Sequence, residues 1–90
     1  MNSKAFVQGV QIKLDPIAPI VLPGIIRKQL TEIGATEDNL TPELAEEFIN
    51  RIDMALGDFL GPEATKLIHQ IMMKELRRCA PEYFDEQSLV

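Results

Sequence analysis

Hydrophobic residues recur at helical spacing through the second half of the chain. Between Thr41 and Cys79 they fall every three or four positions, which places them on one face of a helix. The run Leu60-Gly61-Pro62-Glu63 interrupts the pattern, because glycine ends helices and proline followed by an acid begins them. We therefore predict two helices, 42–60 and 62–79, that form a tight antiparallel hairpin. Their predicted apolar faces are Leu44, Phe48, Ile52, Ala55, Leu56 and Phe59, then Ala64, Leu67, Ile68, Ile71, Met72, Leu76 and Cys79.

One more helix is predicted before the hairpin, over residues 22–33. Pro23 suits its first turn, and Gly34 is a natural C-terminal cap. The polar segment 35–40 has the length usual for a connection between packed helices. Apolar side chains again recur every three or four positions, at Leu22, Ile25, Ile26, Leu30 and Ile33.

The first 21 residues carry a weaker signal. From Val10 to Leu14 apolar and polar residues alternate, which is the spacing of a strand. The chain has no second strand pattern, so a strand here could pair only with another molecule. We expect residues 1–21 to form either an extended, proline-rich arm or an arm whose single strand pairs across a dimer.

These elements make one domain of residues 1–90. We predict an all-α fold: a small three-helix core of residues 22–80, built on the hairpin, with the arm before it and a tail of residues 81–90. We expect Tyr83 and Phe84 to dock on the core and the residues after them to fray.

Composition narrows the class of partner. The hydrophobic share of 46% and the charged share of 26% are ordinary for a folded domain. A net charge of −5 argues against nucleic-acid and membrane partners, since phosphate and anionic lipid would repel the chain. We interpret the basic clusters at 27–28 and 74–78 as helix ends, where cations favour the helix dipole. A single cysteine and the lack of a signal-peptide pattern favour a cytoplasmic location.

The residues that could carry chemistry do not form a recognisable site. His69 and Cys79 stand ten positions apart on one predicted helix, too far to bind one metal ion, so we expect no metal site. We interpret Cys79 as a small buried apolar residue and the carboxylates of residues 43–58 as a solvated face. The glycines form no phosphate-binding loop, so we expect no cofactor and no catalytic residues.

The corner Leu60-Gly61-Pro62-Glu63-Ala64 resembles a known kind of hairpin. It is similar to the short Gly-Pro helix hairpins attached to some bacterial signalling proteins, including serine/threonine kinases and Roadblock-type proteins. The resemblance covers residues 56–73. It implies an association module, and it implies no functional residues.

We therefore expect a non-enzymatic protein-interaction or adaptor domain that forms a homodimer. One alternative is a small regulatory subunit of a larger enzyme complex. Another is a DNA-binding regulator, although its second helix would begin with the acid Glu63 where a DNA reader needs basic or polar residues. Three short helices cannot hide every apolar residue, and the surplus defines the candidate interface: Val10, Ile12, Ile17, Ile20, Val21, Ile49 and Met73.

Overall fold

The N-terminal segment is a helix, α1 (Ser3–Leu14), so the prediction of an extended arm or strand is wrong. The Asn2 side chain begins this helix by accepting a hydrogen bond from the Ala5 N–H at 3.0 Å. The alternation from Val10 to Leu14 was the misleading signal. The helical spacing of Phe6, Val10 and Leu14 decides the outcome, because all three are buried on one face.

The second helix, α2 (Leu22–Glu32), confirms the prediction for this segment. Pro23 lies in its first turn, and Gly34 follows it with a φ of 70°. Leu22, Ile26 and Leu30 face the core, as the spacing indicated. Arg27 and Lys28 lie within the helix rather than at its end.

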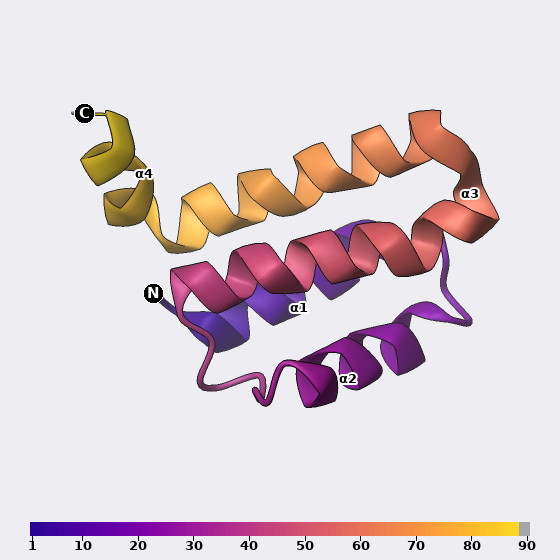
Figure 1. The fold of residues 1–90 in the computed structure, drawn as a ribbon, viewed down its shortest axis with the longest axis horizontal. Helices are drawn as coiled ribbons and strands as arrows, with labels where there is room; N and C mark the ends of the chain where they lie inside the picture. Colours follow the sequence, from indigo (N-terminus) through magenta and orange to yellow (C-terminus); the bar gives the residue numbers. More distant parts are fainter. Residues whose placement is uncertain (89–90) are drawn as a thin grey trace.

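The hairpin, labelled α3 (Pro42–Cys79) as a whole, consists of two helices that meet at a sharp corner. The Thr41 hydroxyl caps its start by accepting from the Leu44 N–H at 3.2 Å. At Gly61 the backbone adopts φ 83° and ψ 171°, a region open almost only to glycine, and the helix direction reverses there. We refer to residues 42–60 and 62–79 as the first and second halves of α3. Figure 1 shows the two halves running antiparallel, as predicted.

The chain after the hairpin forms a short fourth helix, α4 (Pro81–Ser88), which includes residues 85–88, where we expected fraying; residues 89 and 90, for which we expected the same, lie outside the described residues. The computed structural model describes the backbone of residues 1–88 and the side chains of residues 1–84. Tyr83 docks as expected, since its hydroxyl donates to Glu46 Oε2 at 2.8 Å. Phe84 packs edge-on against the Tyr83 ring and lies under the Arg77 guanidinium, 5.2 Å from it.

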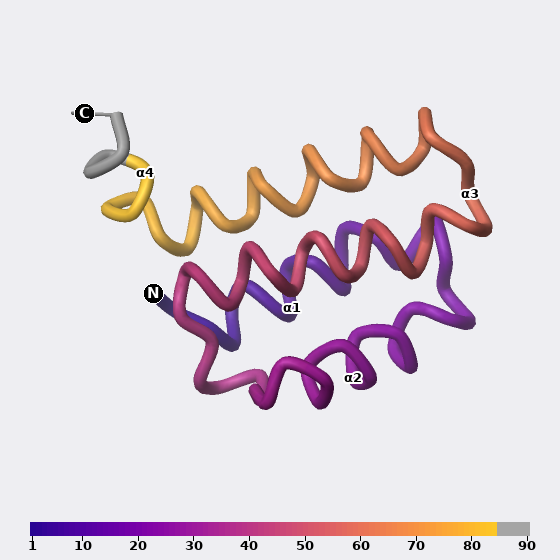
Figure 2. Tube along the Cα trace, viewed as in Figure 1, coloured from indigo at the N-terminus to yellow at the C-terminus, as the bar shows by residue number. Residues whose placement is uncertain are grey.

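The fold is all-α, with no strand in residues 1–88, and α3 contacts the other three helices. In Figure 1, α1 lies behind the first half of α3, and α2 runs beside it. The tube in Figure 2 shows that the α1–α2 connection, residues 15–21, lies at the same end of the molecule as the Gly61 corner. No helix in the described part of the chain is both long and apolar enough to span a membrane. One core joins α1, α2 and α3, and its largest fully buried side chains are Phe6, Phe48, Leu14, Leu22, Ile49, Ile52, Leu56, Ile68, Met72 and Leu76.

Candidate functional site

Two of the seven candidate interface residues belong to the core. Val10 and Ile49 have no exposed surface. The reason is that α1, a helix that we did not predict, adds its apolar face to the core, so apolar residues that three helices could not bury are buried by four. The two residues are therefore not part of the molecular surface, and including them was wrong. Met73 is half-buried and packs against the core. Ile12, Ile17, Ile20 and Val21 are exposed.

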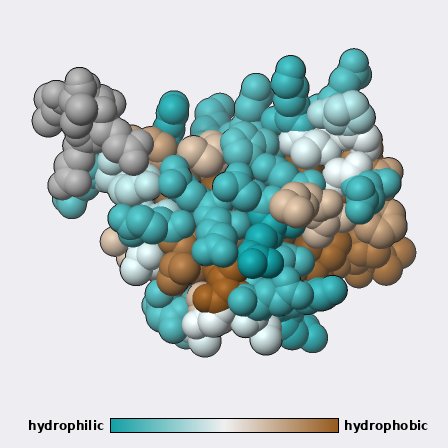
Figure 3. Space-filling view, in the orientation of Figure 1, coloured by the Kyte–Doolittle hydropathy of each residue, from teal (hydrophilic) through white to brown (hydrophobic). Residues whose placement is uncertain are grey.

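Three of the exposed residues come together at one end of the molecule. Ile17, Ile20 and Val21 belong to the α1–α2 connection, and Ile20 is 92% exposed. Phe59, which we predicted to face the core, is 75% exposed and lies beside the Gly61 corner at this same end. Figure 3 shows hydrophobic surface gathered there. We call Ile17, Ile20, Val21 and Phe59 the apolar end.

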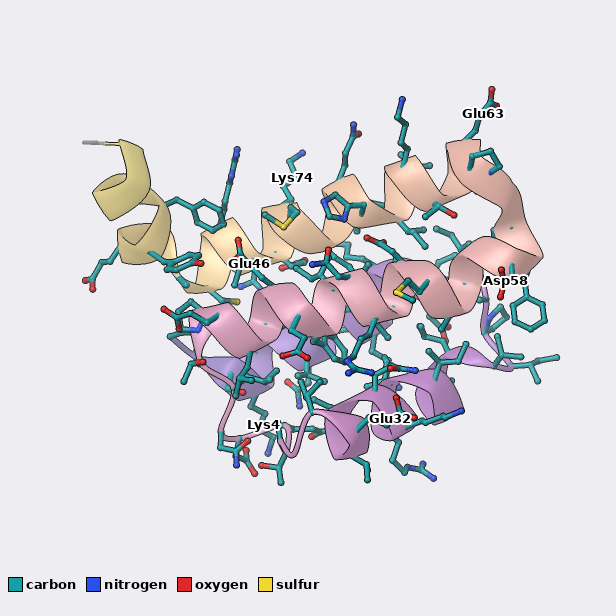
Figure 4. All side chains as sticks on the ribbon, viewed as in Figure 1. Lys4, Glu32, Glu46, Asp58, Glu63 and Lys74 are labelled. Carbon is teal, nitrogen blue, oxygen red and sulfur yellow. The ribbon has the colours of Figure 1, made fainter. Side chains whose placement is uncertain are left out.

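The charges within the segments that form the apolar end are all negative. Asp15, Asp58 and Glu63 are exposed, whereas residues 14–26 and 52–65 contain no lysine or arginine. Figure 4 shows Asp58 and Glu63 at the corner, with Lys74 farther along the second half of α3. The apolar end is therefore a hydrophobic surface with an acidic rim.

A groove of about 620 Å³ runs between α1 and the second half of α3. Ile12 and Ile71 supply its apolar surface, and it continues past Ile71 and Lys74 into a second hollow beside Leu67 and Met73. Leu67 is 54% exposed, although its spacing predicted a core position. Four cations and one carboxylate line these hollows, so we call them together the basic groove: Lys13, Lys74, Arg77, Arg78 and Glu75.

The carboxylate of the basic groove is buried and already paired. Glu75 is only 6% exposed, and its Oε2 accepts a hydrogen bond from Arg78 Nε at 2.7 Å. It lies against Gly9 of α1, where an added Cβ would stand 2.9 Å from both Cδ and Oε2 of Glu75. The hydrogen bond to Glu75 is the main cause that raises the pKa of Arg78, so this cation stays charged. The surface of the groove is consequently basic.

A hydrogen-bonded pair joins the two halves of α3. His69 Nδ1 and Asp53 Oδ2 are 2.5 Å apart, and the other oxygen of Asp53 is buried with no hydrogen-bond partner among the described residues. Burial raises the pKa of the Asp53 carboxyl, and the hydrogen bond and charge of His69 lower it by a smaller amount. The two residues stand at equal distances from Gly61 in the sequence, which is the signal that could have predicted their pairing across the hairpin.

This pair resembles half of a nucleophile-activating arrangement, in which an acid orients an imidazole base. Such chemistry also needs a hydroxyl or thiol within hydrogen-bond reach of the imidazole. Among the described residues, no hydrogen bond connects His69 to a serine, threonine or cysteine. We therefore assign Asp53 and His69 a role in holding the two halves of the hairpin together.

The single cysteine lies at the end of the second half of α3 and is half-buried. Burial is the largest cause that raises the pKa of the Cys79 thiol, while the charge of Arg78 lowers it by less. Within residues 1–84, no group of three or more His, Cys, Asp or Glu side chains is placed to hold a metal ion.

The chain matches no protein-family model, no curated protein and no solved structure. The resemblance of the Gly61-Pro62 corner to association hairpins therefore stays a prediction. What the geometry itself provides is an exposed apolar end with an acidic rim and a separate basic groove.

Proposed function

We propose that this chain is a non-enzymatic protein-interaction domain that self-associates through its apolar end. The observation that carries the proposal is the exposure of Ile20 and Phe59, at 92% and 75%, on a domain that buries most of its other large apolar side chains. Large apolar side chains gathered at one place on the surface are typical of sites that bind another protein. A role as an adaptor in bacterial signalling agrees with the resemblance at the Gly61-Pro62 corner.

The location of the apolar end supports an interaction role. A tight helix corner and a short connection form it, and both are held by the core behind them: Leu22 and Leu56, which follow and precede these segments, are buried. A surface of this kind is already in place before a partner arrives, so binding requires little ordering of the chain.

Sedimentation equilibrium from low micromolar to millimolar concentration tests the proposal. We expect the wild-type chain to associate and Ile20→Glu to remain monomeric, because a charge on this fully solvated side chain disrupts the contact but not the fold. Met54→Glu is the matched control, since Met54 is 75% exposed but lies beside Lys28 and Glu32 on the α2 face. A wild-type chain that stays monomeric over this range, or equal effects of the two variants, would overturn the proposal.

A further inference from the structure

The acidic rim opposes one simple mode of self-association. If two apolar ends packed against each other about a twofold axis, Asp15, Asp58 and Glu63 of one copy would face the same three carboxylates of the other. The segments that form the apolar end contain no lysine or arginine to separate them; the nearest in sequence are Lys13, two positions before Asp15, and Lys66, three positions after Glu63. Like charges brought together at an interface weaken binding and select against that arrangement.

The same chain carries a surface of opposite charge. The basic groove holds four of the nine lysines and arginines of the molecule, and its one carboxylate, Glu75, is buried and bonded to Arg78. Its apolar surface is accessible as well, since Ile12 is 70% exposed and Leu67 is 54% exposed. An apolar ligand with an acidic rim therefore fits this groove in both hydrophobicity and charge.

We infer that the apolar end of one copy docks in the basic groove of a second copy, so that the chain assembles head to tail. This inference rests on the self-association proposed above and names the receiving surface. Ile20 and Phe59 contact the apolar surface at Ile12 and Leu67, while Asp58 and Glu63 face Lys74 and its neighbours. Each added copy presents its own free end and groove, so assembly continues beyond the dimer as a ring or an open chain.

Mixing two blocked variants tests the direction of assembly. Ile20→Glu removes the apolar end, and Ile12→Glu places a charge in the groove; both side chains are largely exposed, so both variants should fold, which circular dichroism verifies. We expect each variant alone to be monomeric at concentrations where wild type associates. An equimolar mixture should form a one-to-one dimer and nothing larger, because only one intact end and one intact groove remain.

Lys74→Glu provides a second groove variant that leaves the apolar surface unchanged. We expect it to weaken self-association at least about tenfold, and added salt should weaken the wild-type assembly, since screening reduces attraction between opposite charges. The control is Lys4→Glu, the same charge reversal at an exposed lysine of α1 that does not line the groove.

The outcomes separate the inference from the proposed function. If wild type stays monomeric, self-association itself is wrong. If wild type associates but Ile12→Glu and Lys74→Glu associate equally well, the ends pack against each other or the groove belongs to a different partner, and the head-to-tail inference is wrong. A mixture of Ile20→Glu and Ile12→Glu that remains monomeric also overturns it.

Discussion

Gly9 of α1 lies directly against the buried carboxylate of Glu75 in the second half of α3. A Cβ at Gly9 would stand 2.9 Å from Glu75 Cδ and 3.1 Å from Arg78 Nη2, closer than side-chain packing allows. Glycine in a helix interior costs about 1 kcal/mol relative to alanine. The glycine at position 9 therefore makes α1 less stable as a helix but allows it to approach Glu75 closely. The contact fixes how α1 lies on the hairpin, and with it the shape of the basic groove.

A double-mutant cycle measures this contact. In a Glu75→Ala background, where the carboxylate is gone, we expect Gly9→Ala to stabilise the fold by about 1 kcal/mol through helix propensity. In the wild-type background the new methyl group must displace Glu75 and Arg78, so the gain should disappear or become a loss. Urea unfolding of the four proteins gives the coupling energy. Equal effects of Gly9→Ala in both backgrounds would contradict the packing described.

Gly61 should be the glycine least tolerant of substitution. Its φ of 83° and ψ of 171° lie where a side chain costs about 1 to 3 kcal/mol, although no neighbour crowds the position. Gly24 is the matched control, because space around it is equally open but it lies within α2, where alanine favours the helix. We expect Gly61→Ala to lower the thermal midpoint and Gly24→Ala to keep or raise it. A tolerated alanine at Gly61 would be inconsistent with this corner geometry.

Ser3 should contribute more to stability than an ordinary exposed serine. Its hydroxyl donates to the Glu37 carbonyl at 2.6 Å and accepts from the Leu40 N–H at 2.9 Å, so it links the start of α1 to the α2–α3 connection. Ser3→Ala leaves a buried N–H without a partner, at a cost of about 1 to 3 kcal/mol in the free energy of unfolding.

Thr31→Ala is the control for this loss. The Thr31 hydroxyl donates to the Arg27 carbonyl within one exposed turn of α2, so its removal should change stability by less than about 0.5 kcal/mol. Denaturant titrations of both variants measure the two losses in the free energy of unfolding. If the two losses are similar, the buried link through Ser3 does not stabilise the fold.

The Asp53 carboxyl should make the folded chain more stable in acid than at neutral pH. This direction is unusual for an acid near a histidine. Burial raises its pKa in the folded state, so the folded chain holds this proton more tightly than the unfolded chain does. Protonation of Asp53 therefore contributes its full stabilisation of the fold at low pH. This stabilisation is lost as the pH rises above about 4, through the raised folded-state pKa.

Comparison with Asp53→Asn isolates this contribution. Relative to that variant, wild type should be most stable in acid and should lose stability toward neutral pH in chemical unfolding experiments. Asp58→Asn removes a carboxylate that is exposed and controls for the change in net charge. A wild-type advantage that instead grows with pH would mean that attraction to His69 outweighs burial.

The sequence predicts the hairpin and α2 well because their signals are local. Thr41, Pro23 and the Gly61-Pro62 pair act within one helical turn, and the structure has helix boundaries at each of them. The all-α class follows from the same signals. The pairing of Asp53 with His69 could also have been predicted, because a known corner fixes which positions of the two helices face each other.

The remaining features depend on distant parts of the chain. Val10 to Leu14 fits both a strand and a helix, and the helix is favoured because Phe6, Val10 and Leu14 meet the apolar faces of α3. Phe59 has helical spacing, yet it is exposed because no helix in the described part of the chain covers the corner end. The basic groove could not be predicted, since its walls come from opposite ends of the chain.

The contact between Gly9 and Glu75 also sets the order in which the fold can be completed. During synthesis α1 emerges first, but the second half of α3, which carries Glu75, emerges only after α2 and the first half of α3. Until then Phe6, Val7 and Val10 have no complete surface to pack on, whereas the hairpin can form from neighbouring residues alone. The hairpin is therefore the natural folding nucleus, and docking of α1 completes the domain.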